Sequence, residues 1–327
     1  MTESLFSGKI SRIGLGTWQL GMRGWGEGYY EEELIKALRA GLEKGLNFVD
    51  TAEIYGNGTS EMLIGKAIQG IRREDVSIAT KVAGFNATAR RVRKRLSGSL
   101  KRLRTDYVDL YQVHWEPSAY TNLRELFREL EKLRDEGLIK HIGVSNFSQE
   151  SIKLGNRAMK EARIESNQIK FNLVERPDQG LLDFMDREGI KLIAWSPLAQ
   201  GFLTGKYSEE RRPSGYVRRI NKLFSPSLFE RYKPLLSKLK EIAEQKKATP
   251  SQVVLSYESD LGVLPIPGFR NTEHVMEIVG ASTLSLSNKE REGLGAALEK
   301  CGVLRASGSF YPRYLPNFIA MMGSLFT

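Results

Sequence analysis

Short apolar runs alternate with longer amphipathic segments along most of the chain. Eight runs predict strands that are apolar on both faces, and they span 13–17, 47–51, 76–81, 107–114, 139–145, 164–169, 190–196 and 262–268. Segments between them, such as 29–45 and 121–137, carry apolar residues at i, i+3 and i+4 and end in glycine. This alternation is typical of a parallel sheet covered by helices.

The predicted strands end at regular intervals. The first five end at Thr17, Asp50, Lys81, His114 and Ser145, with 31 to 33 residues between successive ends. Eight units of about 30 residues predict a (β/α)8 barrel, the TIM-barrel fold. A doubly wound sheet is the alternative. It is disfavoured because Gln19 interrupts the glycine pattern that such a sheet uses to bind dinucleotides.

We expect a single domain over 1–327. The barrel core would occupy about 10–282, and 283–327 would add a C-terminal helix and an aromatic, methionine-rich tail. The tail from about 305 onward is expected to pack on barrel helices, with a membrane or partner anchor as the alternative. The segment 201–227 is rich in glycine, proline and basic residues, which predicts a long loop on the functional face.

Much of the formal net charge of +10 comes from one segment, 89–106, which holds eight lysines and arginines. Val92, Leu96, Leu100 and Leu103 recur in it at helical spacing. The pattern favours a helix with a solvated basic face and an apolar face on the core. A surface for nucleic acid or an acidic partner is the alternative, but no aromatic residues lie among the arginines.

Several classes of protein are disfavoured by composition. The only cysteine is Cys301, so an internal disulfide is excluded, and the three histidines are too scattered for a metal site. The N-terminus lacks the apolar region of a signal peptide, and no run of 18 apolar residues occurs. We therefore expect a cytoplasmic protein without bound metal or membrane contact.

Polar residues at neighbouring strand ends are the candidate catalytic groups. The active site of a (β/α)8 barrel lies at the carboxyl ends of its strands. Asp50 ends the second predicted strand, and Tyr55 follows in its loop. Lys81 and His114 end the third and fourth strands. Each residue alone would be an ordinary structural residue, but the four together predict a catalytic site.

This set of residues suits protonation of a carbonyl oxygen. A tyrosine is a weak acid, with an ordinary pKa of about 10. The Lys81 ammonium is expected to favour the phenolate and so lower the pKa of Tyr55, while Asp50 holds Lys81 in place. A neutral His114 would donate an N–H to the substrate oxygen. The set supplies no electrons, so a bound nicotinamide is the natural reductant.

The same residues lie in stretches that resemble the aldo-keto reductase family, including "NFVDTAEIYGNGTSEMLIGKAI", "LIKHIGVSNFS" and "AWSPLAQGFLTGKY". The resemblance runs over nearly the whole chain, from "IGLGTWQLG" to "IPGFRN". It implies a (β/α)8 barrel that uses NADPH, less often NADH, to reduce aldehydes and ketones to alcohols. The implied catalytic tetrad is Asp50, Tyr55, Lys81 and His114, with Tyr55 as general acid.

The resemblance also implies a cofactor site. Ser145, Asn146 and Gln168 would bind the nicotinamide carboxamide, and Trp195 would stack on the ring. Arg270, near a helix start, favours the 2′-phosphate of NADPH, with His274 as a second contact or an exposed helix residue. The full implied set is Thr17, Trp18, Asp50, Ser145, Asn146, Gln168, Trp195, Ser196, Leu198, Gln200, Gly201, Lys206, Gly268, Arg270 and His274.

Two features bear on recognition beyond this set. Ile278 stands where the family often has an asparagine that contacts adenine, so the adenine contacts are expected to depart from the family pattern. Substrate is expected to contact Tyr55 and His114 between walls formed by Trp18 and Trp115, and Trp25 is a further candidate wall. A small-molecule carbonyl compound is the expected substrate.

Two other functions compete with this one. A regulatory module that holds NADPH as a sensor, as in the potassium-channel β subunits that resemble this family, would use the same cofactor residues. Aldolase-like chemistry would need Lys81 to form a Schiff base. The second alternative is disfavoured because Asp50 would keep Lys81 charged.

Overall fold

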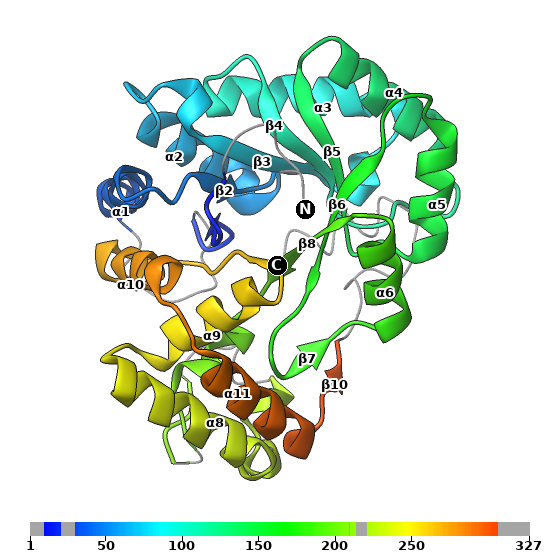
Figure 1. Ribbon diagram of the computed structural model, residues 1–327. Helices are drawn as coiled ribbons and strands as arrows, with labels where there is room; N and C mark the ends of the chain where they lie inside the picture. Colours follow the sequence, from blue (N-terminus) through cyan, green and yellow to red (C-terminus); the bar gives the residue numbers. More distant parts are fainter. Residues whose placement is uncertain (1–9, 21–29, 209, 214–220, 307–327) are drawn as a thin grey trace.

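The computed structural model describes residues 10–20, 30–208, 210–213 and 221–306 (Figure 1). Trp25 lies outside these ranges, as do most of the predicted C-terminal tail and part of the predicted loop 201–227.

Eight parallel strands form one curled sheet at the centre of the molecule (Figure 1), in the order β1-β2-β3-β4-β5-β6-β8-β9. They are β1 Leu15–Gly16, β2 Phe48–Asp50, β3 Ser77–Val82, β4 Val108–Val113, β5 Ile139–Ser145, β6 Ile164–Lys170, β8 Lys191–Trp195 and β9 Leu264–Pro265. Each of the eight predicted runs overlaps one of them, and β3 and β6 each extend one residue past the predicted end. The (β/α)8 barrel predicted from the sequence is confirmed.

The barrel closes where β1 meets the segment around β9. The backbone N–H of Gly14 donates to the carbonyl of Pro265, and that of Gly16 to the carbonyl of Pro267, each at 2.9 Å. Gly16 also forms a parallel bridge with Gly268. A Cβ atom on Gly16 would lie 2.5 Å from the carbonyl oxygen of Ile266. Only glycine therefore allows this close approach of the two backbones.

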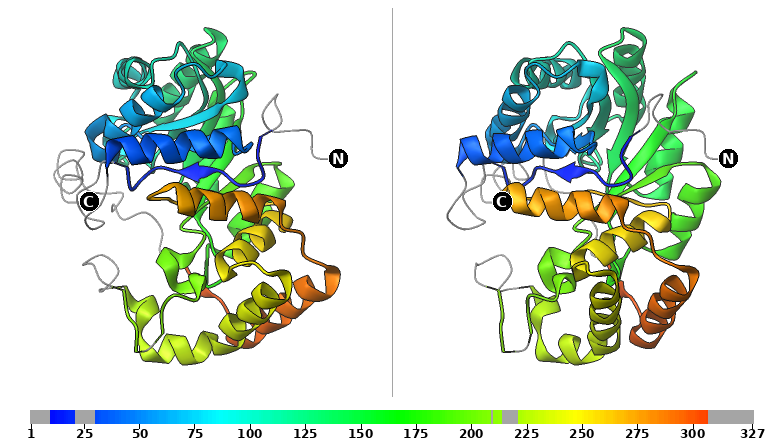
Figure 2. Two further views of the ribbon diagram at one scale, coloured as in Figure 1. Left: turned by 90° about the vertical axis from the view of Figure 1, so that its left-hand side faces the viewer. Right: turned by 60° about the vertical axis from the view of Figure 1, so that its left-hand side comes forward.

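Helices lie around and beside the sheet (Figure 2). They are α1 Glu31–Glu43, α2 Thr59–Ala67, α3 Ala89–Leu103, α4 Leu123–Asp135, α5 Gln149–Ala158, α6 Gln179–Arg187, α8 Pro226–Lys246, α9 Pro250–Asp260, α10 Thr272–Thr283 and α11 Asn288–Cys301. In α4, Leu126, Phe127 and Leu130 are buried at helical spacing, and Asn122 caps the first turn. The first helix, α1, lies beside α10 across the closure (Figure 2).

The last helices form a second apolar cluster beside the barrel. The helix predicted in 283–327 is α11, which begins with a capping box between Ser287 and Glu290. It packs on α8, and the buried side chains between these helices and α9 include Tyr232, Leu239 and Leu294. These helices lie in the lower part of the molecule in Figure 1.

A small two-stranded sheet was not predicted from the sequence. It pairs β7, Glu175–Arg176, with β10, Leu304–Arg305, in parallel. Two residues per strand carry too little apolar alternation to be recognised as a sequence pattern. The pairing fixes the chain after α11 to the loop that follows β6.

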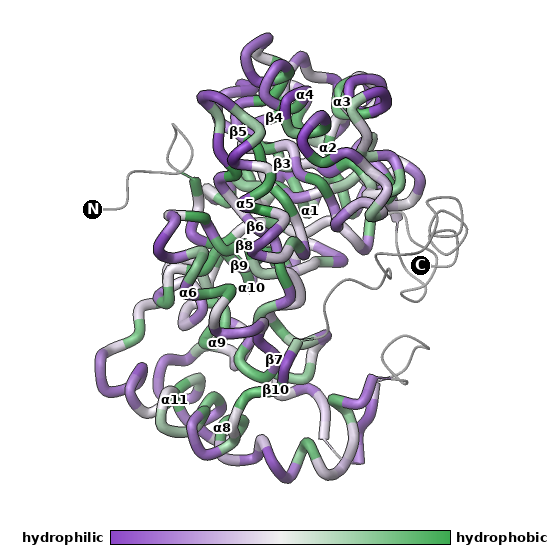
Figure 3. The backbone as a smooth tube through the Cα atoms, turned by 90° about the vertical axis from the view of Figure 1, so that its right-hand side faces the viewer, coloured by the Kyte–Doolittle hydropathy of each residue, from purple (hydrophilic) through white to green (hydrophobic). Residues whose placement is uncertain are grey.

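The inside of the barrel changes from apolar to polar along its axis. Phe48, Ala79 and Leu110 belong to an apolar cluster inside the barrel. Side chains two residues further along a strand point to the same face. The next inward positions, Asp50, Lys81 and Gln112, are therefore stacked above that cluster. In Figure 3 hydrophobic and hydrophilic residues alternate along the central strands and along the helices.

The predicted basic helix is α3, which ends at Leu103. Val92, Leu96 and Leu103 are buried, so the predicted apolar stripe is confirmed. Within the described ranges no helix is long and apolar enough to cross a membrane. The same residues contain no group of three histidine, cysteine or acidic side chains placed to bind a metal ion.

Candidate active site

Tyr55 is placed by a tight turn after β2. Gly56, Asn57 and Gly58 all have positive φ angles, of 57°, 54° and 90°. Glycine and asparagine adopt this left-handed conformation at the lowest cost. The turn starts α2 directly behind Tyr55 and keeps its side chain against the barrel, where 9% of its surface is exposed.

The four predicted catalytic side chains meet at the carboxyl ends of β2, β3 and β4. The Nζ atom of Lys81 lies 2.6 Å from Asp50 Oδ1 and 3.3 Å from the Tyr55 hydroxyl. That hydroxyl lies 3.4 Å from Nε2 of His114. Lys81 also donates to the carbonyl of Thr51 at 2.8 Å and is fully buried.

Burial and charge set the protonation states of two of these groups. The pKa of His114 is lowered well below its ordinary value, by burial and then by the positive charge of Lys81. The imidazole is therefore neutral at physiological pH, the state in which it could donate an N–H to a substrate oxygen. Burial also lowers the pKa of Lys81, and the negative charges of Asp50 and Glu61 oppose that effect.

The predicted lowering of the Tyr55 pKa is wrong for this structure. Burial, and then the negative charge of Asp50, raise the pKa of Tyr55 well above its ordinary value. The prediction failed because Asp50 balances the charge of Lys81, so that desolvation of the phenolate prevails. The phenol thus stays protonated and can act as a proton donor.

A glutamine that the sequence analysis did not single out lies beneath the cluster. Gln112 on β4 donates from Nε2 to Asp50 Oδ2 at 3.2 Å. Gln168 on β6 donates to the same oxygen at 2.7 Å. Asp50 thus has hydrogen-bond partners on both carboxylate oxygens. Strand alternation could have revealed Gln112, because it precedes His114 by two residues and shares its face.

The residues predicted to bind nicotinamide lie beside His114. Asn146, after β5, accepts a hydrogen bond on Oδ1 from Trp195 Nε1 at 3.1 Å. Its amide nitrogen donates to the hydroxyl of Ser145 at 3.0 Å. Gln168 is also nearby, but its amide nitrogen is directed to Asp50.

Two buried polar atoms in this region have no hydrogen-bond partner among the described residues. They are the hydroxyl oxygen of Ser196 and Nδ1 of His114. Ser196, directly after β8, also has a positive φ of 58°. Unsatisfied buried polar atoms are rare in folded proteins, so atoms of a bound ligand are suitable partners for these two.

The chain after β8 turns sharply, as a loop along a pyrophosphate would require. Leu198 precedes a kinked 3-10 segment, Ala199–Thr204, in which Gln200 and Gly201 are left-handed. The predicted loop 201–227 is therefore partly helical, because this segment extends into it and the 3-10 turn Lys222–Phe224 falls within it.

Two predicted cations, Lys206 and Arg270, lie near His274 at the start of α10. Asn271 caps this helix by accepting the His274 backbone N–H at 2.9 Å. The pKa of His274 is lowered, first by partial burial and then by the charge of Lys206, with a further contribution from Arg270. Lys206 comes from the loop after β8, so two distant segments supply positive charge to one helix N-terminus.

The other predicted residues surround this centre. The Thr17 hydroxyl donates to the carbonyl of Asp50 at 2.7 Å. Gly268 lies at the barrel closure. Trp115 is buried, with its ring centroid 5.0 Å from that of His114, whereas Trp18 is half-buried.

Ile278, the position expected to depart from the family's adenine contact, lies on the buried face of α10. Its side chain is buried and belongs to the main core cluster, so it supports the packing of α10.

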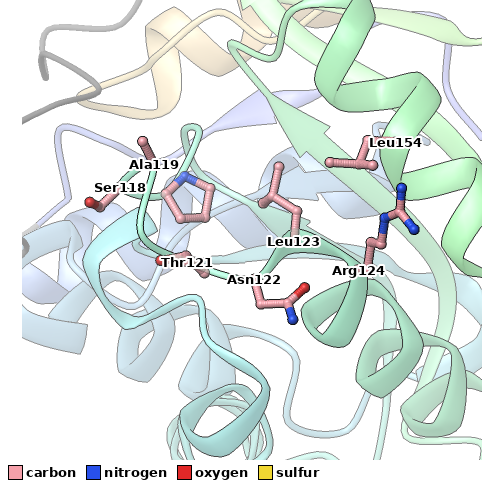
Figure 4. A pocket seen from close by; sticks show the side chains of 8 residues that line it. Ser118, Ala119, Thr121, Asn122, Leu123, Arg124 and Leu154 are labelled. Atoms are coloured by element: carbon pink, nitrogen blue, oxygen red, sulfur yellow. The ribbon is translucent and has the colours of Figure 1, made fainter.

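A surface pocket lies apart from the catalytic cluster. Its volume is about 230 Å³, and it is lined by side chains between Pro117 and Arg124 and by Leu154 (Figure 4). None of the four catalytic candidates lines it.

The fold and the cluster define a class of protein: a (β/α)8-barrel enzyme whose mouth holds a protonated phenol, a buried ammonium and a neutral imidazole. A profile of the aldo/keto reductase family matches residues 12–299, so the chain belongs to that family.

Known proteins agree with this assignment. An uncharacterized oxidoreductase of Mycobacterium tuberculosis is 38% identical over 295 residues, which cover 88% of this chain and 89% of that protein. The glycerol dehydrogenase of Gluconobacter oxydans has 27% identity and a TM-score of 0.81, covering 94% of this chain and 98% of that one.

An aldo/keto reductase of Klebsiella pneumoniae, solved with NADP and acetate, is also similar. It has 30% identity and a TM-score of 0.70, covering 88% of this chain and 91% of that one. The family and the class of enzyme predicted from the sequence, an NAD(P)H-dependent oxidoreductase, are confirmed.

Proposed function

We propose that this protein reduces small aldehydes and ketones to alcohols with NADPH, and that Tyr55 donates the proton to the carbonyl oxygen. The observation that carries the proposal is the protonated, buried Tyr55 hydroxyl between Lys81 Nζ at 3.3 Å and His114 Nε2 at 3.4 Å. Bound NADPH supplies the hydride that the carbonyl carbon accepts.

Each of the four residues has a separate part in this mechanism. Neutral His114 orients the carbonyl oxygen next to the Tyr55 hydroxyl. Lys81 stabilises the negative charge that develops on the phenol oxygen as its proton leaves. Asp50 keeps Lys81 in place through the 2.6 Å ion pair. Gln112 and Gln168 orient Asp50 by binding its second oxygen.

The side chains around the mouth fit a dinucleotide phosphate. Asn146, Ser145 and Trp195 would hold the nicotinamide. The hydroxyl of Ser196, which has no hydrogen-bond partner in the part of the chain that the structure describes, is a suitable donor to the pyrophosphate. Lys206 and Arg270 at the start of α10 favour a 2′-phosphate over a ribose hydroxyl, which supports NADPH over NADH. The NADP complex of the Klebsiella pneumoniae relative supports the same choice.

The test measures oxidation of NADPH by a nitrobenzaldehyde at the nicotinamide absorbance band. Tyr55→Phe removes only the acidic hydroxyl and should lower kcat by about 100-fold or more, with NADPH affinity unchanged. Tyr107→Phe is the matched control, because this residue precedes β4 at the opposite end of the barrel and should keep full activity.

Two results would contradict the proposal. Turnover by Tyr55→Phe at the wild-type rate would remove Tyr55 as the acid. Tight binding of NADPH by the wild-type protein without turnover of any carbonyl compound would instead favour a sensor that holds the cofactor.

A further inference from the structure

The basic helix α3 directs two of its arginines toward buried carboxylates near the catalytic strands. Arg95 Nε donates to Glu53 Oε2 at 2.6 Å, and Arg102 Nε donates to Glu61 Oε2 at 2.7 Å. Both glutamate side chains are fully buried. The two arginines are seven residues apart, which places them on one face of the helix.

Glu53 connects the two segments that carry Tyr55 and Lys81. Its Oε1 accepts hydrogen bonds from the Ala83 backbone N–H and the Asn86 amide, each at 2.9 Å. Its own backbone N–H donates to the carbonyl of Lys81 at 3.1 Å. Glu53 precedes Tyr55 by two residues, so one side chain fixes the Tyr55 loop against the end of β3.

Arg95 supplies the positive charge opposite the second oxygen of Glu53. A buried carboxylate without a positive partner is costly and moves toward other partners or water. Among the described residues Arg95 supplies the ion pair to Glu53. The Tyr55 hydroxyl lies 3.3 Å from Lys81 Nζ and 3.4 Å from His114 Nε2, distances at the long end of hydrogen bonding. A small shift of the Tyr55 loop would therefore interrupt proton transfer.

We propose that Arg95 is a positioning residue, which acts through Glu53 to hold Tyr55 in its catalytic geometry. The proposal rests on the proposed function, in which Tyr55 is the proton donor. It also assigns a role to part of the positive charge of α3: Arg95, whose side chain is 40% exposed but reaches Glu53, supports the active site of its own chain.

The test is single-turnover reduction of a nitrobenzaldehyde by enzyme loaded with NADPH, followed at the nicotinamide band. Arg95→Met keeps the length of the side chain and removes the ion pair. The rate of hydride transfer should fall about tenfold to 100-fold, as expected for a displaced catalytic group. The Kd for NADPH, from nicotinamide fluorescence, should stay within about twofold because α3 lies away from the cofactor residues.

Arg93→Met is the matched control. Arg93 lies on the same helix and pairs with Glu129 and Glu136, outside the Tyr55 loop. The substitution removes the same charge from α3 but should leave hydride transfer at the wild-type rate. Equal rates for the Arg95 and Arg93 variants would overturn the proposal.

Two further variants separate positioning from damage to the fold. Arg95→Met combined with Glu53→Gln removes the unpaired buried charge, so hydride transfer should recover relative to Arg95→Met alone. Glu53→Asp keeps the charge, but its side chain is too short to reach both Ala83 and Arg95, so it should slow hydride transfer. This variant tests the proposal if Arg95→Met does not fold. Wild-type transfer in Glu53→Asp would overturn the proposal.

The Tyr55→Phe variant separates a failure of the positioning role of Arg95 from a failure of the proposed function. If Tyr55→Phe is slow and Arg95→Met is unaffected, the positioning role is wrong and the proposed function stands. If Tyr55→Phe also transfers hydride at the wild-type rate, the proposed function itself is wrong.

Discussion

A phenol can serve as an acid only while it keeps its proton, and the surroundings of Tyr55 ensure this. A lysine beside a tyrosine is expected to lower the pKa of the phenol, but only where no negative group balances the charge of the lysine. Here Asp50 accepts the hydrogen bond of Lys81 and cancels much of its field. The phenol therefore remains protonated until the carbonyl oxygen of a substrate accepts its proton.

This arrangement predicts a flat pH profile for carbonyl reduction. A raised Tyr55 pKa keeps the acid protonated as the pH rises, and a lowered His114 pKa keeps the imidazole neutral as the pH falls. We expect kcat/KM for reduction to be constant from about pH 6 to about pH 9, between the regions where these groups would titrate. Initial rates across this range provide the check, and a tenfold fall between pH 7 and pH 8 would show that Tyr55 has a lowered pKa.

A second residue, distant from the chemistry, should make stability depend on pH. Glu258 on α9 is fully buried, and neither carboxylate oxygen has a hydrogen-bond partner among the described residues. Burial raises the pKa of Glu258 well above its ordinary value, with Arg176 opposing the effect. The folded state thus binds a proton more tightly than the unfolded state, and its stability falls as the pH rises from the unfolded pKa toward the folded pKa.

Replacing this side chain tests that sign. Glu258→Gln should be more stable than wild type at pH 8, by about 1–3 kcal/mol, because it never has to carry a buried charge. The difference should shrink toward pH 5. Urea unfolding at the two pH values measures it, and Glu299→Gln on the exposed face of α11 should show no such difference. A Glu258→Gln variant that is less stable at pH 8 would contradict the sign.

At the scale of elements, regular spacing was the most informative property of the sequence. Strand ends 31 to 33 residues apart predicted the barrel because each βα unit must span its height and return. The predicted strand 262–268 was longer than β9 because Pro265 and Pro267 lack the N–H that a strand ladder needs. The pair β7 and β10 could not be predicted, since tertiary placement alone brings it together.

The barrel closure makes a prediction at the same scale. Gly16→Ala would place a Cβ atom 2.5 Å from the Ile266 carbonyl, so one of the two backbones must move. We expect a loss of about 1–3 kcal/mol in the free energy of unfolding. Thermal unfolding measures the loss, with Gly98→Ala as the control. That glycine lies inside α3, where alanine is the better helix former, so the control should be neutral or stabilised.

At the scale of the whole molecule, the candidate site joins residues from both ends of the chain. Asp50, Tyr55, Lys81 and His114 were predictable because successive parallel strands place their ends together. Strand alternation places Gln112 on the same face as His114, but the pattern alone does not reveal its hydrogen bond to Asp50. The extent of the single domain over 1–327 and the role of the tail stay predictions.

Cofactor choice is a property of the whole molecule too, because Lys206 and Arg270 reach the start of α10 from separate segments. NADPH at about 100 times its Kd should stabilise the protein by about 2.7 kcal/mol. Arg270→Met should weaken this effect for NADPH and leave the smaller effect of NADH unchanged. Melting temperatures with each cofactor measure both, and an equal loss for NADH and NADPH would contradict a contact with the 2′-phosphate.

The contact between Gly16 and Gly268 joins positions about 250 residues apart, and this separation affects when the barrel can close during folding. Contacts between such distant positions are slow to form. During synthesis the segment around Gly16 also leaves the ribosome long before the segment around Gly268. Strands β2 to β6, which carry the reacting side chains, can pair with their neighbours during synthesis. The barrel therefore cannot close until the ribosome has made the segment around Gly268, which lies in the final third of the chain.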